Sequence, residues 1–97
     1  MAEVIILEFD GDAALYNKVN DLLGLNPDTG TGEWPKGIVS HVGAATATGI
    51  VVMEVWESQA DQEAFMASRL GPALAKAEAP QPKRVEWMSL LGQQYAS

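Results

Sequence analysis

The only histidine of the chain, His41, is the residue best suited to acid–base chemistry. An imidazole has an unperturbed pKa near neutrality, so it can take up or release a proton at physiological pH. As a general base, His41 could deprotonate a phenol or an enol to a carbanion that reacts directly with dioxygen. A hydrogen-bonded structural histidine within a sheet is the alternative, and the sequence alone does not separate the two.

Glu54 is the second candidate for chemistry, because it interrupts an otherwise apolar run from Ile50 to Trp56. A carboxylate in such a run is expected to be at least partly buried, where it needs a hydrogen-bonding or charged partner. Glu54 could then act as a base. A structural ion pair with Arg69, Arg84 or a second subunit is the alternative, and Glu8 is a weaker case of the same kind.

Aromatic and methionine side chains could form the walls of a site for a small apolar or aromatic molecule. Trp34 is the most distinctive of them, since it lies in the breaker-rich segment 25–36. A large aromatic there either holds the loop down or closes over a pocket. The others are equally compatible with the core. The candidate ligand-binding residues are Tyr16, Trp34, Trp56, Phe65 and Met66.

The composition argues against several kinds of site. The chain has no cysteine, so it cannot form a disulfide, a thiolate metal site or a cysteine nucleophile. One imidazole without a second histidine is a poor metal-ligand set, and the sequence contains no phosphate-binding loop, dinucleotide-binding glycine motif or nucleophile elbow. We therefore expect no bound metal and no cofactor.

The charge pattern bears on partners and location. Thirteen acidic and six basic residues give a formal net charge of -7, and the basic residues are dispersed. Nucleic-acid binding requires clustered basic side chains, so we expect neither a nucleic-acid nor an anionic-membrane partner. The apolar run at 4–9 is too short for a signal peptide or a membrane span. We expect a cytoplasmic protein.

The elements that position these residues are predicted from periodicity and capping. Apolar and β-branched runs predict strands over 4–9, 37–43, 49–56 and 85–91. A first helix is expected between Asp12 as N-cap and Gly24 as the stop. A second helix begins at the Ser58–Asp61 capping box, is interrupted at Gly71–Pro72, and ends before Pro80.

The central hairpin has an undetermined register at this stage. A shift of one residue exchanges the two faces of a strand. His41 therefore shares a face either with Glu54 and Trp56 or with Met53 and Val55.

The order βαββαβ predicts one α+β domain over 1–97, of the ferredoxin-like type, with an antiparallel four-stranded sheet and both helices on one face. Three of the strands carry large apolar side chains at both odd and even positions. The uncovered face would then be an apolar patch larger than soluble monomers usually carry. We expect a homodimer joined through these sheet faces, and a partner domain in another protein is the alternative.

Several short segments resemble the antibiotic biosynthesis monooxygenase-like (ABM-like) group of the dimeric α/β-barrel superfamily. They are Gly37–His41, Val55–Ser58 with its Trp-Glu-Ser sequence, Phe65, and Arg69–Leu74. The resemblance implies a barrel of two sheets, with a ligand cavity in each subunit between its helices and its own sheet. It also implies a range of activities, from oxygenases of polycyclic aromatics that use no metal or flavin to isomerases and stress proteins. In the haem-degrading branch the second helix carries a tryptophan and a haem-ligating histidine, and the matching positions here are Phe65 and Ala75, which argues against haem degradation.

Two hypotheses follow, since fold alone does not determine function. In the first, a homodimeric monooxygenase-like domain binds a small apolar or aromatic molecule and could oxidise it without a cofactor, with His41 as the base. In the second, a non-catalytic binding or structural dimer fills its helix-side space with its own side chains. A cavity lined by His41 would favour the first hypothesis, and a space filled by Trp56, Phe65 and Trp87 would favour the second.

Overall fold

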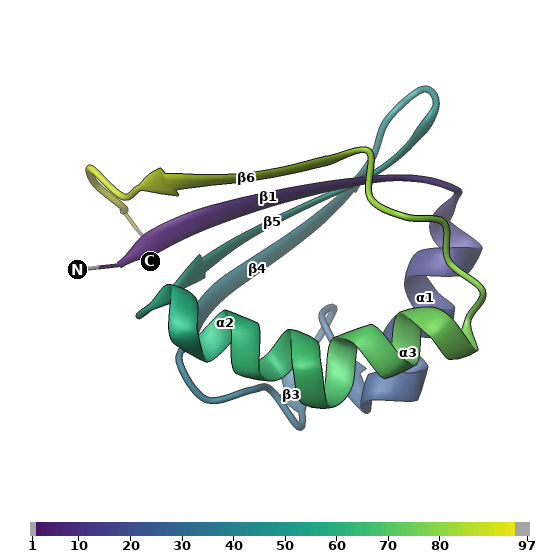
Figure 1. Ribbon diagram of the computed structural model, residues 1–97, viewed down its shortest axis with the longest axis horizontal. Coiled ribbons are helices and arrows are strands. Elements are labelled where there is room, and N and C mark those ends of the chain that lie inside the picture. Colours follow the sequence, from purple (N-terminus) through teal and green to yellow (C-terminus); the bar gives the residue numbers. More distant parts are fainter. Residues whose placement is uncertain (1, 95–97) are drawn as a thin grey trace.

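The structure is a computed structural model that describes residues 2–94, and it contains one four-stranded antiparallel sheet with helices on one face (Figure 1). The strands are β1 (Glu3–Asp10), β4 (Ile38–Ala45), β5 (Gly49–Trp56) and β6 (Arg84–Ser89), in the spatial order β4-β5-β1-β6. The helical layer comprises α1 (Ala13–Leu23) and a long segment made of α2 (Gln59–Phe65), the π-helical η1 (Met66–Leu70) and α3 (Gly71–Lys76). The expected α+β class, ferredoxin-like order and one-sided helical layer are confirmed.

Helix α1 begins and ends where its capping residues predict. The Asp12 carboxylate accepts a hydrogen bond from the backbone N–H of Leu15 at 3.2 Å. Gly24 follows the helix with φ 73°, in the left-handed region that glycine adopts without strain. The helix thereby presents one face to the sheet, and this face carries Tyr16 and, one turn later, Asn20.

The second helical segment differs from the prediction at Gly71–Pro72. Ser58 does cap the segment, because its hydroxyl accepts from the backbone N–H of Asp61. The chain then stays helical through Pro72 and widens into the π-helical turn η1, where the Gly71 N–H donates to the carbonyl of Met66. This shift places proline in the first turn of α3, where its missing N–H costs no hydrogen bond.

The segment 25–36, expected to be irregular, contains a small hairpin of β2 (Leu25–Asn26) and β3 (Thr31–Gly32). The Asn26 side chain accepts hydrogen bonds from the backbone N–H groups of Asp28 and Thr29 and so closes the turn. Short-range polar contacts rather than apolar periodicity build this hairpin, so a search for apolar runs does not find it.

The register of the β4–β5 hairpin pairs His41 with Glu54. His41, Glu54 and Trp56 therefore share the face that points toward the helices, and Met53 lies on the opposite face. This pairing decides between the two registers that the sequence left open.

The core lies between the helices and the facing side of the sheet. Alternate residues of β1 point into it, and Ile5, Leu7 and Phe9 are all buried. The fully buried Trp56 lies against Phe65, with ring centroids 5.8 Å apart. The other buried apolar residues of this cluster are Val19, Leu23, Leu25, Leu70, Ala73 and Ala77.

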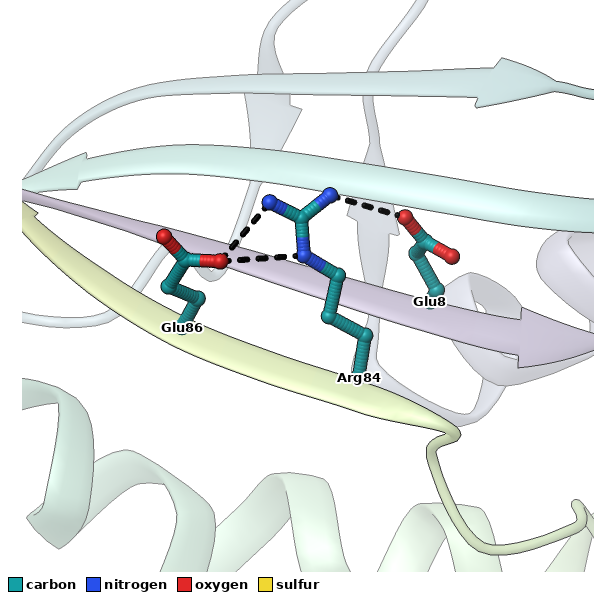
Figure 2. A network of polar contacts seen from close by, with 3 residues as sticks. All are labelled: Glu8, Arg84 and Glu86. Carbon is teal, nitrogen blue, oxygen red and sulfur yellow. Dashed lines mark hydrogen bonds and ion pairs between the residues drawn. The ribbon is translucent and has the colours of Figure 1, made fainter.

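The outer face of the sheet is partly apolar and partly charged. Over β1 and β6, Arg84 binds Glu8 at 3.0 Å and Glu86 at 2.8 Å, as Figure 2 shows. The expected ion pair of Glu8 is thus confirmed. Over β4 and β5 the exposed large side chains of this face are apolar, and they include Val42 and Met53. Among the described residues, no helix is long and apolar enough to cross a membrane.

Candidate functional site

A chain of hydrogen bonds runs through His41 on the helix-facing side of the sheet. Its Nδ1 lies 2.7 Å from a Glu54 carboxylate oxygen, and its Nε2 lies 2.6 Å from the Tyr16 hydroxyl. The other Glu54 oxygen accepts from the Trp56 indole N–H at 3.1 Å. An ionised carboxylate only accepts hydrogen bonds, so a proton on Nδ1 would be donated to Glu54, and Nε2 could then accept from the Tyr16 hydroxyl. We call this set the Tyr16–His41–Glu54 chain.

Three elements bring this chain together. The antiparallel pairing of β4 and β5 sets His41 directly across from Glu54, and α1 lays Tyr16 over the strand. Gly43 lies two residues beyond His41 on the same face, and a Cβ there would overlap the Tyr16 ring. The glycine thus leaves the space in which the phenol reaches the imidazole. The rings of Tyr16 and His41 are stacked, with centroids 5.9 Å apart.

The chain is shielded from solvent. The His41 and Glu54 side chains are 9% and 6% exposed. Burial raises the pKa of Tyr16, the negative charges of Glu54 and Asp28 act in the same direction, and the nearby Asn20 amide opposes them. Since the net shift is upward from an already high value, Tyr16 stays protonated at neutral pH and acts as a neutral donor.

The expected ion pair of Glu54 with Arg69 or Arg84 is wrong. Arg84 lies on the outer face with Glu8, and Arg69 donates to the backbone carbonyl of Leu23 at the end of α1. Glu54 is satisfied instead by an imidazole and an indole, because the strand register turns its side chain into the core. Its predicted burial is confirmed.

A partly open apolar cavity of about 60 Å³ adjoins this chain between the sheet and the helices. Its polar lining residues are Tyr16, Asn20, His41 and Glu54. An apolar cavity of about 150 Å³ is enough for benzene in a protein core, so this cavity takes a ring only if it widens. The apolar lining includes Leu7, Phe9, Leu15, Val52, Phe65, Leu70 and Leu74.

A second, more open hollow of about 300 Å³ also borders His41, beside the small hairpin. Trp34 lines it, with its ring centroid 5.3 Å from that of His41. The Trp34 indole donates to the carbonyl of Thr31 at 3.0 Å. Trp34 therefore holds the hairpin and at the same time lies against the site. His41 borders both spaces.

The candidate ligand-binding residues divide between these spaces and the core. Tyr16 and Phe65 line the apolar cavity, and Trp34 lines the outer hollow. Trp56 lines neither and supports Glu54 from within the core. Met66 packs against the core and also lines neither space. The catalytic and binding roles of all these residues stay predictions.

Two contributors were not found from the sequence. Asn20 is a buried polar residue that lines the cavity, and its signal is a polar side chain between Val19 and Leu23 on the apolar face of a helix. Gly43 has no such signal, because the need for space at this position follows only from where α1 crosses β4.

The described residues contain no group of three or more histidine, aspartate or glutamate side chains that could hold a metal ion. His41 and Glu54 are the one close pair of this kind at the site, and each already binds a neighbouring side chain. The arrangement is suited to holding and moving a proton.

Gly43→Ala is expected to push the Tyr16 ring away from His41 and to lower the free energy of unfolding by about 1–3 kcal/mol, because the added methyl overpacks a filled site. The chain has one histidine, so NMR of its imidazole reports the lost hydrogen bond directly. Gly92→Ala is the matched control, since a Cβ there meets nothing within 4 Å. An unchanged imidazole signal in Gly43→Ala would contradict the spacing role.

No protein-family model matches the sequence, and no curated protein sequence matches it significantly. Solved structures do match, over nearly the whole chain. A Nitrosomonas europaea protein of unknown function, NE2512, superposes with a TM-score of 0.70 at 15% identity, covering 99% of this chain and 95% of that one. A Chloroflexus aurantiacus J-10-fl protein that carries the name antibiotic biosynthesis monooxygenase gives 0.65 at 14% identity, with 98% of each chain covered.

A third match is the monooxygenase from the gene ActVA-Orf6 of Streptomyces coelicolor, solved in complex with nanaomycin D. It superposes with a TM-score of 0.56 at 21% identity, covering 99% of this chain and 91% of that one. At these identities the matches establish a shared fold. The fold resemblance to the antibiotic biosynthesis monooxygenase-like group is confirmed.

Proposed function

From its antibiotic biosynthesis monooxygenase-like fold, we propose that the protein binds a small apolar molecule with an acidic phenol or enol and oxidises it with dioxygen. The observation that carries the proposal is the Tyr16–His41–Glu54 chain at the wall of an apolar cavity. The Streptomyces coelicolor monooxygenase supports it by analogy of fold, because that protein is a monooxygenase solved in complex with the ligand nanaomycin D.

The proton path follows the hydrogen bonds. A ligand hydroxyl in the cavity gives its proton to the Tyr16 oxygen while Tyr16 gives its own proton to His41 Nε2. Glu54, 2.7 Å from Nδ1, stabilises the imidazolium that forms. The raised pKa of Tyr16 keeps the phenol neutral before and after the transfer, so Tyr16 touches the substrate and His41 stores the proton.

The oxidation balances without an external reductant. A ketone with an activated CH₂ group carries the ligand hydroxyl as its enol, in which the first C–H proton has moved to the oxygen. Loss of that hydroxyl proton gives an anion that transfers electrons to dioxygen and forms a carbon–oxygen bond at the former CH₂ carbon, and the imidazolium returns its proton to give a hydroperoxide. Loss of the second C–H proton and cleavage of the O–O bond then yield a carbonyl group and water. In sum, R₂CH₂ and O₂ give R₂C=O and H₂O, so the substrate supplies all four electrons.

The size of the cavity favours a second candidate function, a non-catalytic binding or structural dimer. About 60 Å³ is well below the roughly 300–1,000 Å³ of typical ligand pockets, and Trp56 packed on Phe65 fills much of the helix side. Under the catalytic proposal, a two-ring substrate has to occupy the cavity and the outer hollow together. The hollow borders the same imidazole and measures about 300 Å³.

Oxygen uptake separates the two functions. With a chelator present to suppress metal-catalysed autoxidation, we expect the protein to consume one O₂ per molecule of 2-tetralone or anthrone, ketones with two and three rings and an activated CH₂ group. With ¹⁸O₂, one label should enter the product and one the water. Binding of these ketones by calorimetry without any oxygen uptake would instead establish the non-catalytic function.

We propose in addition that the protein is a homodimer joined through its outer sheet faces. The exposed Val42 and Met53 support this arrangement, because they lie together on β4 and β5 where the register pairs them. The charged cluster of Glu8, Arg84 and Glu86 lies over the other strands and would flank the apolar contact.

A further inference from the structure

We infer that the Asn20 side-chain amide is a hydrogen-bond donor for a ligand oxygen, so that the cavity selects apolar molecules that carry a carbonyl or phenolate oxygen. This inference rests on the proposed function and names the substrate class of the same site. It assigns a role to the one polar cavity residue that the Tyr16–His41–Glu54 chain does not use.

The Asn20 donor is unusual because it is buried without a partner. The residue is 6% exposed and lines the cavity, and among the described residues its Nδ2 has no hydrogen-bond acceptor. Nearly all buried polar side-chain atoms in folded proteins have a partner. A donor without a protein partner beside an apolar cavity is therefore expected to meet its acceptor in a bound molecule.

The neighbouring groups define what that acceptor is. Tyr16, His41 and Glu54 already bind one another, and Trp56 binds Glu54. Asn20 lies one helical turn from Tyr16 and is close enough to act on its phenol, although it forms no hydrogen bond of ordinary geometry with it. A ligand oxygen placed between the two side chains would contact both.

Such a position suits the chemistry of deprotonation. When the ligand hydroxyl gives its proton to Tyr16, negative charge develops on the ligand oxygen, and a fixed N–H aimed at that oxygen stabilises the charge in a water-poor site. The remaining lining is apolar, so the rest of the ligand is expected to be hydrocarbon. Asn20 would thus contribute both to the selection of the ligand and to the rate of its deprotonation.

The test uses two ligands of the same shape, 2-tetralone with its carbonyl and tetralin without it. We expect the wild-type protein to bind 2-tetralone about tenfold more tightly in calorimetric titrations, the usual size of one added hydrogen bond. Asn20→Leu, of similar volume, should abolish this preference and raise the melting temperature, because it removes an unpaired buried donor. Asn17→Leu is the control, since Asn17 is an exposed residue of the same helix.

Equal affinity of the wild-type protein for the two ligands, or failure to bind either, would overturn the inference. So would an Asn20→Leu variant that keeps the preference or melts at a lower temperature, because the amide would then be structural. These outcomes do not depend on turnover. A carbonyl preference without oxygen uptake would support the role of Asn20 while refuting the oxygenase function, and oxygen uptake without the preference would do the reverse.

Discussion

Replacing His41 with glutamine is expected to lower the turnover of 2-tetralone by about 10²–10⁴-fold, the usual contribution of a general base. A glutamine amide can still donate to Glu54 but cannot accept a proton from Tyr16 at neutral pH. The substitution therefore removes proton storage while keeping a polar side chain across from Glu54 on β5. The initial rate of oxygen uptake, with protein concentration matched by absorbance, measures the effect.

Stability must be measured on the same variant, because His41 has two hydrogen-bond partners in the folded protein. A structural histidine would show its loss mainly as a lower melting temperature. Tyr16→Phe provides the companion test, since it interrupts the same proton path while leaving the His41–Glu54 contact in place. An unchanged rate of oxygen uptake in His41→Gln would refute the role of His41 as a general base, whatever the melting temperature of the variant.

If the proposed sheet-face dimer of twice 10.4 kDa forms, Met53→Asp is expected to convert it to a monomer. Met53 is 44% exposed on the outer face of β5, and an unpaired carboxylate buried between two sheet faces would cost several kcal/mol. Because the register places this side chain away from the core, the folded monomer should survive. Light scattering at micromolar concentration gives the mass, and circular dichroism reports the fold.

Leu22→Asp is the matched control for this substitution. Leu22 is 40% exposed, nearly the same as Met53, but it lies on α1 in the helical layer. If the sheet faces form the interface, Leu22→Asp leaves the mass unchanged. A monomeric wild-type protein, or dissociation by the helix substitution alone, would show that the outer sheet face is not the interface.

The sequence by itself determined the four strands of the main sheet, the two helical segments and their order, because the signals for these elements are local. The apolar run at 4–9, the caps at Asp12, Gly24 and Ser58, and the hairpin over 37–56 depend on neighbours in the chain. Elements in this order can be arranged in only a few ways when the crossovers between strands are right-handed. The ferredoxin-like fold could therefore be predicted from the order of the elements. His41 was identified by its residue type, and Glu54 by its position as a carboxylate within an apolar run.

The tertiary structure alone decided how these residues meet. Strand register set His41 against Glu54, and a shift of one residue would have placed them on opposite faces. The partner of Tyr16, the space left by Gly43 and the unpaired amide of Asn20 depend on where α1 crosses the sheet. Such contacts join residues that are distant in the chain, and their geometry is set by the packing of whole elements, which local sequence signals do not encode.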